Sequence, residues 1–282
     1  MGLLSETIAA LRDAGARPRK ALGQHFLVDD NIAALIVGLA LAEPSEGMLE
    51  IGPGLGLLTA RLAEKGTRLL AIEKDPLLAR LAGKAVAGLP AAEVLAGDFL
   101  RADLQALLGR GKWTLVGNLP YSITAPIIFR ALEERRHFSR MILMVQREVG
   151  QRMLAEPGGK EFGLLGILVQ MYCRGRVAKV VSPNCFYPPP QVHSAIVELT
   201  VRQRPAVVVR DQRAFIAFCK RLFQQRRKQL LTILRRMLPR QSRTALSQVL
   251  REAGIRPEAR PEQLPLASLA RLYRALAAEV EQ

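Results

Sequence analysis

The sequence predicts an α/β domain with a mostly parallel central sheet and helices on both faces, followed by a small C-terminal all-α domain. Three observations support this prediction. Short apolar segments alternate with helical patterns between residues 47 and 117, a glycine-rich turn follows the first apolar segment, and the residues after 205 are helical and basic. Alternating strands and helices are typical of βαβ units, which form parallel sheets covered on both faces.

Seven apolar segments are predicted to be strands. Helices are predicted between the early strands, over residues 57–63 and 76–87, and after the fifth strand, over residues 148–154. The last two strands are expected at the far edge of the sheet. The predicted strands are residues 47–51, 68–72, 92–96, 113–116, 141–145, 178–181 and 195–201.

A linker is predicted at residues 201–205, which contain two arginines and a proline. Beyond it, the basic run at residues 224–228 interrupts an apolar helical face, so we expect it to connect two helices. Four prolines and a glycine divide the rest of the tail into short helices. The predicted domains are residues 1–200 and 206–282.

Composition excludes several classes of protein. Hydrophobic residues make up 49% of the chain and charged residues 23%, which is typical of a folded globular protein. The longest apolar runs are too short to span a bilayer, and the N-terminus lacks the apolar region of a signal peptide. We therefore expect a cytoplasmic protein without membrane contact. Three scattered cysteines and three scattered histidines predict neither a disulfide framework nor a zinc site.

Positive charge is concentrated in the last part of the chain. Residues 200–282 contain 18 basic and 6 acidic residues, whereas the whole chain has a net charge of +16. An excess of this size in a short helical region predicts a polyanionic partner and favours a nucleic acid.

The glycine-rich turn at residues 50–56 has the sequence Glu-Ile-Gly-Pro-Gly-Leu-Gly. Glycines between a strand and a helix let the backbone approach a ligand closely and leave helix N–H groups free. The spacing GxGxG after an acid resembles the S-adenosylmethionine loop of Rossmann-like methyltransferases. The turn alone leaves a nicotinamide cofactor open as an alternative.

Two acidic residues are predicted at the ends of the next two strands. Glu73 ends the second strand, 21 positions after Gly52, where an acid can accept hydrogen bonds from both hydroxyls of a ribose. Asp98 ends the third strand and can accept a hydrogen bond from the exocyclic amine of an adenine. Each has a simpler alternative, Asp98 as a helix cap and Glu73 as a surface acid. Their joint position favours a binding cleft.

The segment Asn118-Leu119-Pro120-Tyr121 follows the fourth strand. The N6 lone pair of adenine is delocalised into the ring, and two acceptors aimed at its N–H groups would free that pair. The side-chain oxygen of Asn118 and the carbonyl of Leu119 are suited to this role, because Pro120 has no N–H and fixes the turn. Tyr121 offers a face on which a flipped base can stack.

Together these motifs resemble the ribosomal RNA adenine N6-dimethyltransferase family, in particular its bacterial small-subunit branch. The resemblance extends over most of the chain and rests on residues 21–27 (ALGQHFL), 50–56, Glu73, Asp98, 118–121, 145–149 (VQREV), 182–190 (SPNCFYPPP) and 223–228 (FQQRRK). It implies a Rossmann-like class I methyltransferase domain with S-adenosylmethionine as methyl donor. The implied reaction forms N6,N6-dimethyladenosine at two adjacent adenosines, in a hairpin near the 3′ end of 16S ribosomal RNA. The implied partner is the RNA of an immature small (30S) subunit, and we expect a monomer.

The resemblance also implies roles for individual residues. His25 and Leu27 would close over the cofactor, with its site completed by Gly52, Glu73, Asp98 and Asn118. Asn118, Leu119, Pro120 and Tyr121 would form the catalytic segment, and Phe186 would stack on the target base opposite Tyr121. The sequence departs from the family pattern at two histidines. His25 stands where Asn is frequent, which predicts a pH-sensitive hydrogen bond, and His193 stands where Asp is usual.

Four alternatives stay open at this point. The large-subunit (23S) methyltransferases of macrolide resistance share the GQxFL and NxPY segments. Adenine-N6 DNA methyltransferases are disfavoured because the chain has no large target-recognition domain. A non-catalytic ribosome-assembly factor with the same fold is disfavoured by the intact segment at residues 118–121. An NAD-linked oxidoreductase is disfavoured by the glycine spacing and the basic domain.

RNA binding is expected to weaken steeply with salt if the C-terminal basic residues contact phosphates, because each contact releases counterions. The affinity for ribosomal RNA should be measured over a series of potassium chloride concentrations. An affinity that does not change with salt would contradict the assignment of this region as the polyanion contact.

Overall fold

The computed structural model describes residues 2–19 and 23–280 of the chain. Ala21 and Leu22 of the predicted ALGQHFL segment lie outside the described residues. The chain forms two compact units, Met1–Gly150 with Arg174–Val201, and Gln151–Cys173 with Arg202–Gln282. None of the described helices is both long enough and apolar enough to cross a membrane.

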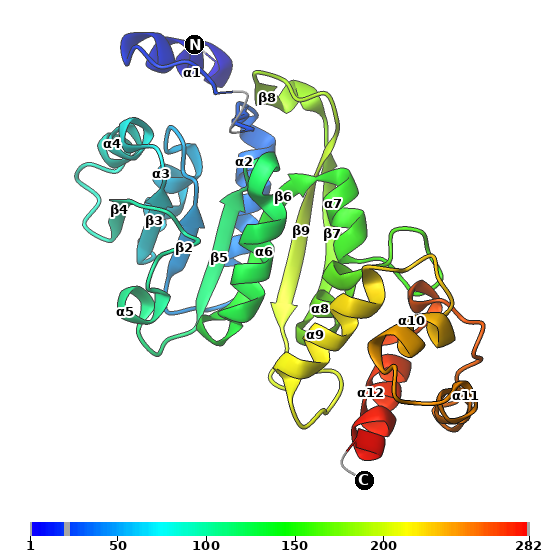
Figure 1. The fold of residues 1–282 in the computed structure, drawn as a ribbon. Helices are drawn as coiled ribbons and strands as arrows, with labels where there is room; N and C mark the ends of the chain where they lie inside the picture. Colours follow the sequence, from blue (N-terminus) through cyan, green and yellow to red (C-terminus); the bar gives the residue numbers. More distant parts are fainter. Residues whose placement is uncertain (1, 20–22, 281–282) are drawn as a thin grey trace. The chain divides into compact units, whose positions relative to one another are not determined.

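A seven-stranded sheet forms the centre of the first unit (Figure 1). Its strand order is β4-β3-β2-β5-β6-β9-β7, with β2 to β6 parallel and β9 antiparallel to β6. The chain crosses between the two halves of the sheet after β4, so that ligands are expected at the carboxyl ends of β2 and β5. The strands are β2 (Met48–Ile51), β3 (Leu69–Glu73), β4 (Ala92–Ala96), β5 (Trp113–Asn118), β6 (Phe138–Gln146), β7 (Cys173–Val181) and β9 (Ser194–Val201).

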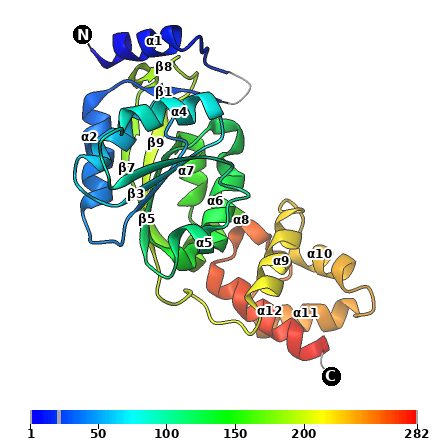
Figure 2. The same ribbon diagram turned by 90° about the vertical axis from the view of Figure 1, so that its left-hand side faces the viewer.

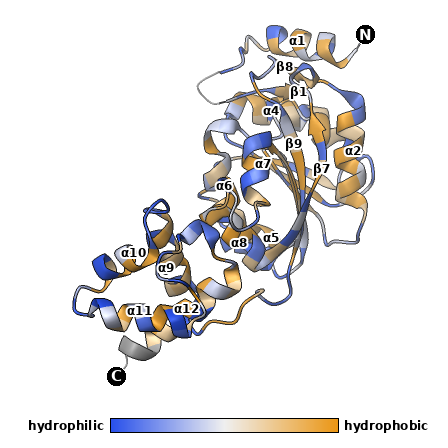
Figure 3. Cartoon of the chain, turned by 90° about the vertical axis from the view of Figure 1, so that its right-hand side faces the viewer, coloured by the Kyte–Doolittle hydropathy of each residue, from blue (hydrophilic) through white to orange (hydrophobic). Residues whose placement is uncertain are grey.

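Helices cover both faces of this sheet (Figures 1 and 2). On one face, α2 packs in an apolar cluster with Ile142, Met144 and Ile196, and α2 is hydrophobic along most of its length (Figure 3). On the other face, Gly150 of α7 lies against Val145 and Val197, whose side chains alternate with those of the first cluster. The helices are α1 (Leu3–Asp13), α2 (Asp30–Leu41), α3 (Leu57–Ala63), α4 (Pro76–Ala85), α5 (Leu104–Leu108), α6 (Thr124–Glu133) and α7 (Arg147–Met153).

A second, two-stranded sheet joins distant parts of the first unit. Strand β1 (Phe26–Leu27) pairs antiparallel with β8 (Phe186–Tyr187). The ladder continues beyond the strands, because the N–H of Val28 donates to the carbonyl of Cys185 over 2.8 Å. This pair fixes the segment before α2 against the segment between β7 and β9.

The second unit is helical. It contains α8 (Leu164–Tyr172), α9 (Gln212–Phe223), α10 (Leu230–Met237), α11 (Arg243–Glu252) and α12 (Leu266–Val280). Helix α8 contacts α9 and α12, and α10 contacts α11. The basic run at residues 224–228 lies between α9 and α10, as predicted.

The predicted fold class is confirmed, and every predicted strand end lies within five residues of the observed one. The grouping of the chain differs from the predicted domains at one segment. Residues 151–173, which we assigned to the first domain, belong to the helical unit because α8 packs on α9 and α12. The last boundary between the two units, after Val201, coincides with the predicted linker. As functional domains, the two parts stay a prediction.

Gly56 makes the close approach of α3 to α4 possible. It has φ +88°, and a Cβ there would lie 2.9 Å from the Cβ of Ala85 and 3.0 Å from the Cα of Ala82. Gly66 also has a positive φ, +71°, but a Cβ there would have no neighbour within 4 Å. A side chain at Gly56 would therefore meet both backbone strain and steric crowding, whereas a side chain at Gly66 would meet backbone strain alone.

Gly56→Ala is expected to lower the free energy of unfolding by roughly 2 to 5 kcal/mol, because strain and overpacking add. Gly66→Ala should cost only about 1 to 2 kcal/mol, because strain acts alone there. Urea unfolding of both variants measures the difference. Equal costs would show that helix packing does not constrain Gly56.

Candidate active site

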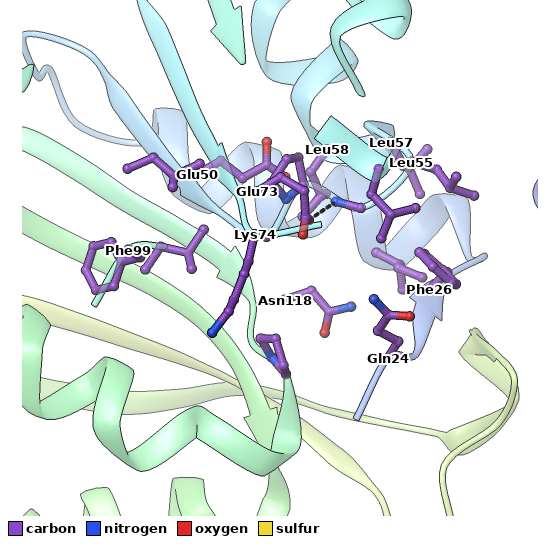
Figure 4. A pocket seen from close by; sticks show the side chains of 18 of the residues that line it. Gln24, Phe26, Glu50, Leu55, Leu57, Leu58, Glu73, Lys74, Phe99 and Asn118 are labelled. Carbon is purple, nitrogen blue, oxygen red and sulfur yellow. Dashed lines mark hydrogen bonds between the residues drawn. The ribbon is translucent and has the colours of Figure 1, made fainter. Parts of the chain in front are cut away.

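A pocket opens at the carboxyl ends of β2, β3 and β5 (Figure 4). Its lining includes seven of the residues predicted for the site, namely His25, Leu27, Gly52, Glu73, Asp98, Asn118 and Pro120. The remaining predicted residues, Leu119, Tyr121 and Phe186, are not among those that line it. The glycine-rich turn, α1 and the segment before α2 also contribute to the walls.

Glu73 joins the glycine-rich turn to the end of β3. Its Oε2 accepts a hydrogen bond from the N–H of Gly54 over 3.1 Å, and its Oε1 accepts one from the N–H of Asp75 over 2.9 Å. Burial raises the pKa of this carboxyl, and these backbone hydrogen bonds oppose the rise. A carboxylate has about four acceptor positions, so that Glu73 can also accept from the hydroxyls of a ligand.

Asp98 is held by two neighbours at the rim of the pocket. The Nζ of Lys74 donates to its Oδ2 over 2.9 Å, and the N–H of Leu100 donates to its Oδ1 over 3.0 Å. The hydrogen bond from Lys74 is the main cause that lowers the pKa of Asp98 below its usual value. Asp98 therefore caps a turn and lines the pocket, but it does not cap the following helix, because the N-cap of α5 is Asp103. Its contact with an adenine amine stays a prediction.

Glu50 is a pocket residue that our site prediction omitted. Its side chain is only 1% exposed, and its Oε2 has no hydrogen-bond partner among the described residues. Burial, together with the neighbouring Glu73 carboxyl, raises the pKa of Glu50 to about 7. The acid before the first glycine was visible in the sequence, but its burial depends on the helices that cover β2.

Asn118 is oriented by the segment that precedes α2. Its Nδ2 donates a hydrogen bond to the carbonyl of His25 over 2.9 Å. Because the amide nitrogen is held in this way, the amide oxygen points elsewhere, and Asn118 lines the pocket (Figure 4). The ring of His25 is itself fixed, since its Nδ1 lies 2.7 Å from the carbonyl oxygen of Pro188.

The rest of the segment after β5 forms a tight turn. The Leu119 side chain is buried, and its N–H donates to the carbonyl of Met144 over 3.0 Å. The carbonyl of Pro120 accepts from the hydroxyl of Thr124 over 2.9 Å and from the N–H of Ile123 over 3.2 Å. Tyr121 is half-buried and begins a short 3-10 turn that leads into α6.

Phe186 and Leu27 belong to one apolar cluster, and Leu27 also lines the pocket. They are 2% and 7% exposed and are paired with each other in the β1–β8 ladder. Because Phe186 is buried and does not line the pocket, its stacking on a base stays a prediction. His193 is exposed, and its carbonyl accepts a hydrogen bond from the N–H of Arg147.

The pocket residues fit S-adenosylmethionine. The buried carboxyl of Glu50, with a free oxygen, suits a cationic ligand, and the acids at residues 73 and 98 suit ribose hydroxyls and an adenine amine. In the glycine-rich turn, Gly52 has φ +68° and lines the pocket, and the absence of a Cβ lets a ligand approach the backbone there. The fold and the site define an S-adenosylmethionine-dependent methyltransferase.

Comparison with known proteins identifies the family. The profile described as ribosomal RNA adenine dimethylase matches residues 15–278. The chain is 39% identical over 271 residues to the ribosomal RNA small subunit methyltransferase A of Geobacter metallireducens, covering 95% of this chain and 98% of that protein. It is 40% identical over 279 residues to the protein of the same name from Moorella thermoacetica, covering 96% of both chains. The chain belongs to the ribosomal RNA adenine dimethylase family.

Two solved structures share the fold over nearly the whole chain. A dimethyladenosine transferase from Plasmodium falciparum has a TM-score of 0.77 and 25% identity, with 91% of this chain and 98% of that chain covered. The 23S rRNA methyltransferase ErmE has a TM-score of 0.69 and 26% identity, with 89% and 99% covered. The protein is an S-adenosylmethionine-dependent rRNA adenine dimethyltransferase by fold, cofactor and family.

The raised pKa of Glu50 predicts a pH-dependent stability. Between pH 4.5 and about 7 the unfolded chain releases this proton and the folded protein retains it. The free energy of unfolding should therefore fall by up to about 3 kcal/mol as the pH rises through this window. Glu50→Gln should remove this component and be more stable than the unmodified protein at pH 8.

Urea unfolding at pH 5 and pH 8 measures the effect in the absence of cofactor. Glu93→Gln, an exposed glutamate on β4, is the matched control and should follow the unmodified protein at both pH values. The same pH dependence in Glu50→Gln as in the unmodified protein would contradict the assignment.

Proposed function

We propose that the protein dimethylates two adjacent adenosines at N6, in a hairpin near the 3′ end of 16S ribosomal RNA. The observation that carries this proposal is the 39–40% identity, over about the full length of both chains, to proteins named ribosomal RNA small subunit methyltransferase A. The identity to the 23S rRNA methyltransferase ErmE is only 26%. This difference supports the small-subunit target over the large-subunit alternative.

The cofactor site is proposed to be formed by the predicted residues together with Glu50. Glu73 accepts the ribose hydroxyls, Asp98 accepts the adenine amine of the cofactor, and Gly52 leaves room for the backbone approach. His25 and Leu27 close the pocket from the segment before α2. When bound, S-adenosylmethionine supplies an activated methyl group on a sulfonium.

Catalysis is proposed to rest on positioning. The side-chain oxygen of Asn118 and the carbonyl oxygen of Leu119 accept the two N–H groups of the target amine. They localise the N6 lone pair, which forms the new bond to the methyl carbon as the bond from carbon to sulfur breaks. The proton of N6 then leaves to water. No strong base is needed, because holding the amine in line with the methyl carbon supplies most of the acceleration. Tyr121 provides the surface on which the flipped base stacks.

The second unit is proposed to bind the RNA of an immature small subunit. It carries most of the excess positive charge of the chain, in residues 202–282 and in particular in the connection between α9 and α10. A cytoplasmic location follows from this substrate. The monomeric state stays a prediction.

The target is tested by incubating the protein with methyl-labelled S-adenosylmethionine and three substrates. These are unmethylated small subunits, unmethylated large-subunit RNA and DNA, and the labelled nucleosides are identified by mass. Dimethyladenosine in the small-subunit RNA alone is the expected result. Label in the large-subunit RNA would indicate a 23S rRNA methyltransferase of the macrolide-resistance branch. No label, with binding to small subunits retained, would indicate a non-catalytic assembly factor.

Asn118→Ala is expected to reduce the methylation rate by roughly 100-fold or more, because a preorganised contact to the reacting amine is lost. RNA binding should be unchanged. Asn31→Ala, which removes an exposed amide in the first turn of α2, is the matched control and should keep the full rate. A rate close to that of the unmodified protein for Asn118→Ala, with RNA binding intact, would contradict the catalytic role.

A further inference from the structure

The hydroxyl of Tyr121 is bound to a buried serine. Its oxygen lies 2.5 Å from the Oγ of Ser194, which is 73 residues away in the sequence. Ser194 is 0% exposed, whereas the ring of Tyr121 is half-buried. A short hydrogen bond between two partly or fully buried hydroxyls is well shielded from water.

Ser194 is a rigid anchor because it belongs to the central sheet. It is the first residue of β9 and pairs with Gln146, the last residue of β6, in the antiparallel ladder. Next to this pair, the N–H of Arg147 donates to the carbonyl of His193 over 2.9 Å. The backbone of Tyr121 belongs to a three-residue 3-10 turn and not to the sheet. The hydrogen bond to Ser194 therefore connects the ring of Tyr121 to the sheet.

A second contact restrains the same ring from the segment before α2. The rings of His25 and Tyr121 have their centroids 5.1 Å apart and are tilted by 33°. His25 is held by the carbonyl of Pro188, 2.7 Å from its Nδ1. The ring of Tyr121 is therefore fixed at its hydroxyl by Ser194 and at its side by His25.

We infer that Ser194 is a positioning residue for the second methyl transfer, acting through Tyr121. This inference rests on the proposed function. An unmodified target adenine has two N–H groups for the acceptors at Asn118 and Leu119. After the first transfer the amine has a single N–H, so that one of those two contacts is lost. The orientation of the monomethylated base then depends more on the stacking surface, and hence on the hydrogen bond that fixes it.

The test compares Ser194→Ala with Tyr121→Phe, because each variant removes one partner of the same hydrogen bond. Both should lower kcat for the second transfer by roughly 3- to 10-fold, the range expected for one hydrogen bond. Monomethyladenosine should accumulate in small subunits, while the KM for the RNA and the Kd for S-adenosylmethionine stay unchanged. The double variant should be no worse than either single variant, since both remove one interaction.

Ser139→Ala is the matched control. Ser139 lies at the amino end of β6, whereas the pocket lies at the carboxyl ends of the parallel strands, and Ser139→Ala should give the same product ratio as the unmodified protein. The hydrogen bond itself is followed by the NMR resonance of the Tyr121 Cζ carbon in protein labelled at its four tyrosines. The resonance is assigned with Tyr121→Phe and is expected to move in Ser194→Ala without any RNA.

An unchanged ratio of monomethyl to dimethyl product in both variants, with an active unmodified protein, would overturn the inference and leave the proposed function standing. Equal decreases in the rates of both methyl transfers, accompanied by a lower unfolding temperature, would also overturn the inference, since that pattern indicates a structural role alone. If Ser194→Ala does not fold, Tyr121→Phe gives the same product test. An unmodified protein that methylates no substrate would overturn the proposed function and this inference with it.

Discussion

The cofactor edge of the sheet depends on one buried carboxylate. Glu73 accepts backbone N–H groups from the turn after β2 and from the turn after β3, so that two neighbouring strands are locked at the point where each ends. Asp75, which donates one of these bonds, in turn accepts the N–H of Leu77 and caps α4. The side chain of Glu73 therefore connects the glycine-rich turn, the end of β3 and the residue that caps α4. A ligand that binds there meets a preorganised surface.

The other wall of the pocket is assembled from segments that are distant in the sequence. The residues before α2 are tied to the end of β5 by the bond from Asn118 to the His25 carbonyl, and to β8 by the short ladder. Phe26 lies against Gly54, so that the same segment also touches the glycine-rich turn. The segment before α2 therefore connects β8 and the glycine-rich turn to the side chain of Asn118, which faces the target base in the proposed mechanism.

Local signals in the sequence were sufficient for the sheet and for one side of the pocket. Glycine spacing and acids at strand ends depend on neighbours along the chain, and for this reason the positions of Gly52, Glu73 and Asp98 at one edge could be predicted. The β1–β8 pair could not be, because two-residue strands have no periodicity and their partners are about 160 residues apart. The burial of Glu50 and Phe186, and the pairing of Lys74 with Asp98, likewise depend on tertiary packing. The grouping of residues 151–173 with the helical unit has the same cause.

The path of the chain between the two units has a consequence for the modularity of the protein. The chain leaves the α/β unit after Gly150, returns at Arg174 and leaves again after Val201. Six of the nine residues of α8 are buried, and α8 contacts α9 and α12, which follow Val201 in the sequence. A cut at residue 201 would therefore remove the partners of α8 but leave α8 itself attached to the sheet. To exchange the complete helical unit, both of its segments, residues 151–173 and 202–282, must be replaced. A chimera joined at one position would contain only part of the original helical unit.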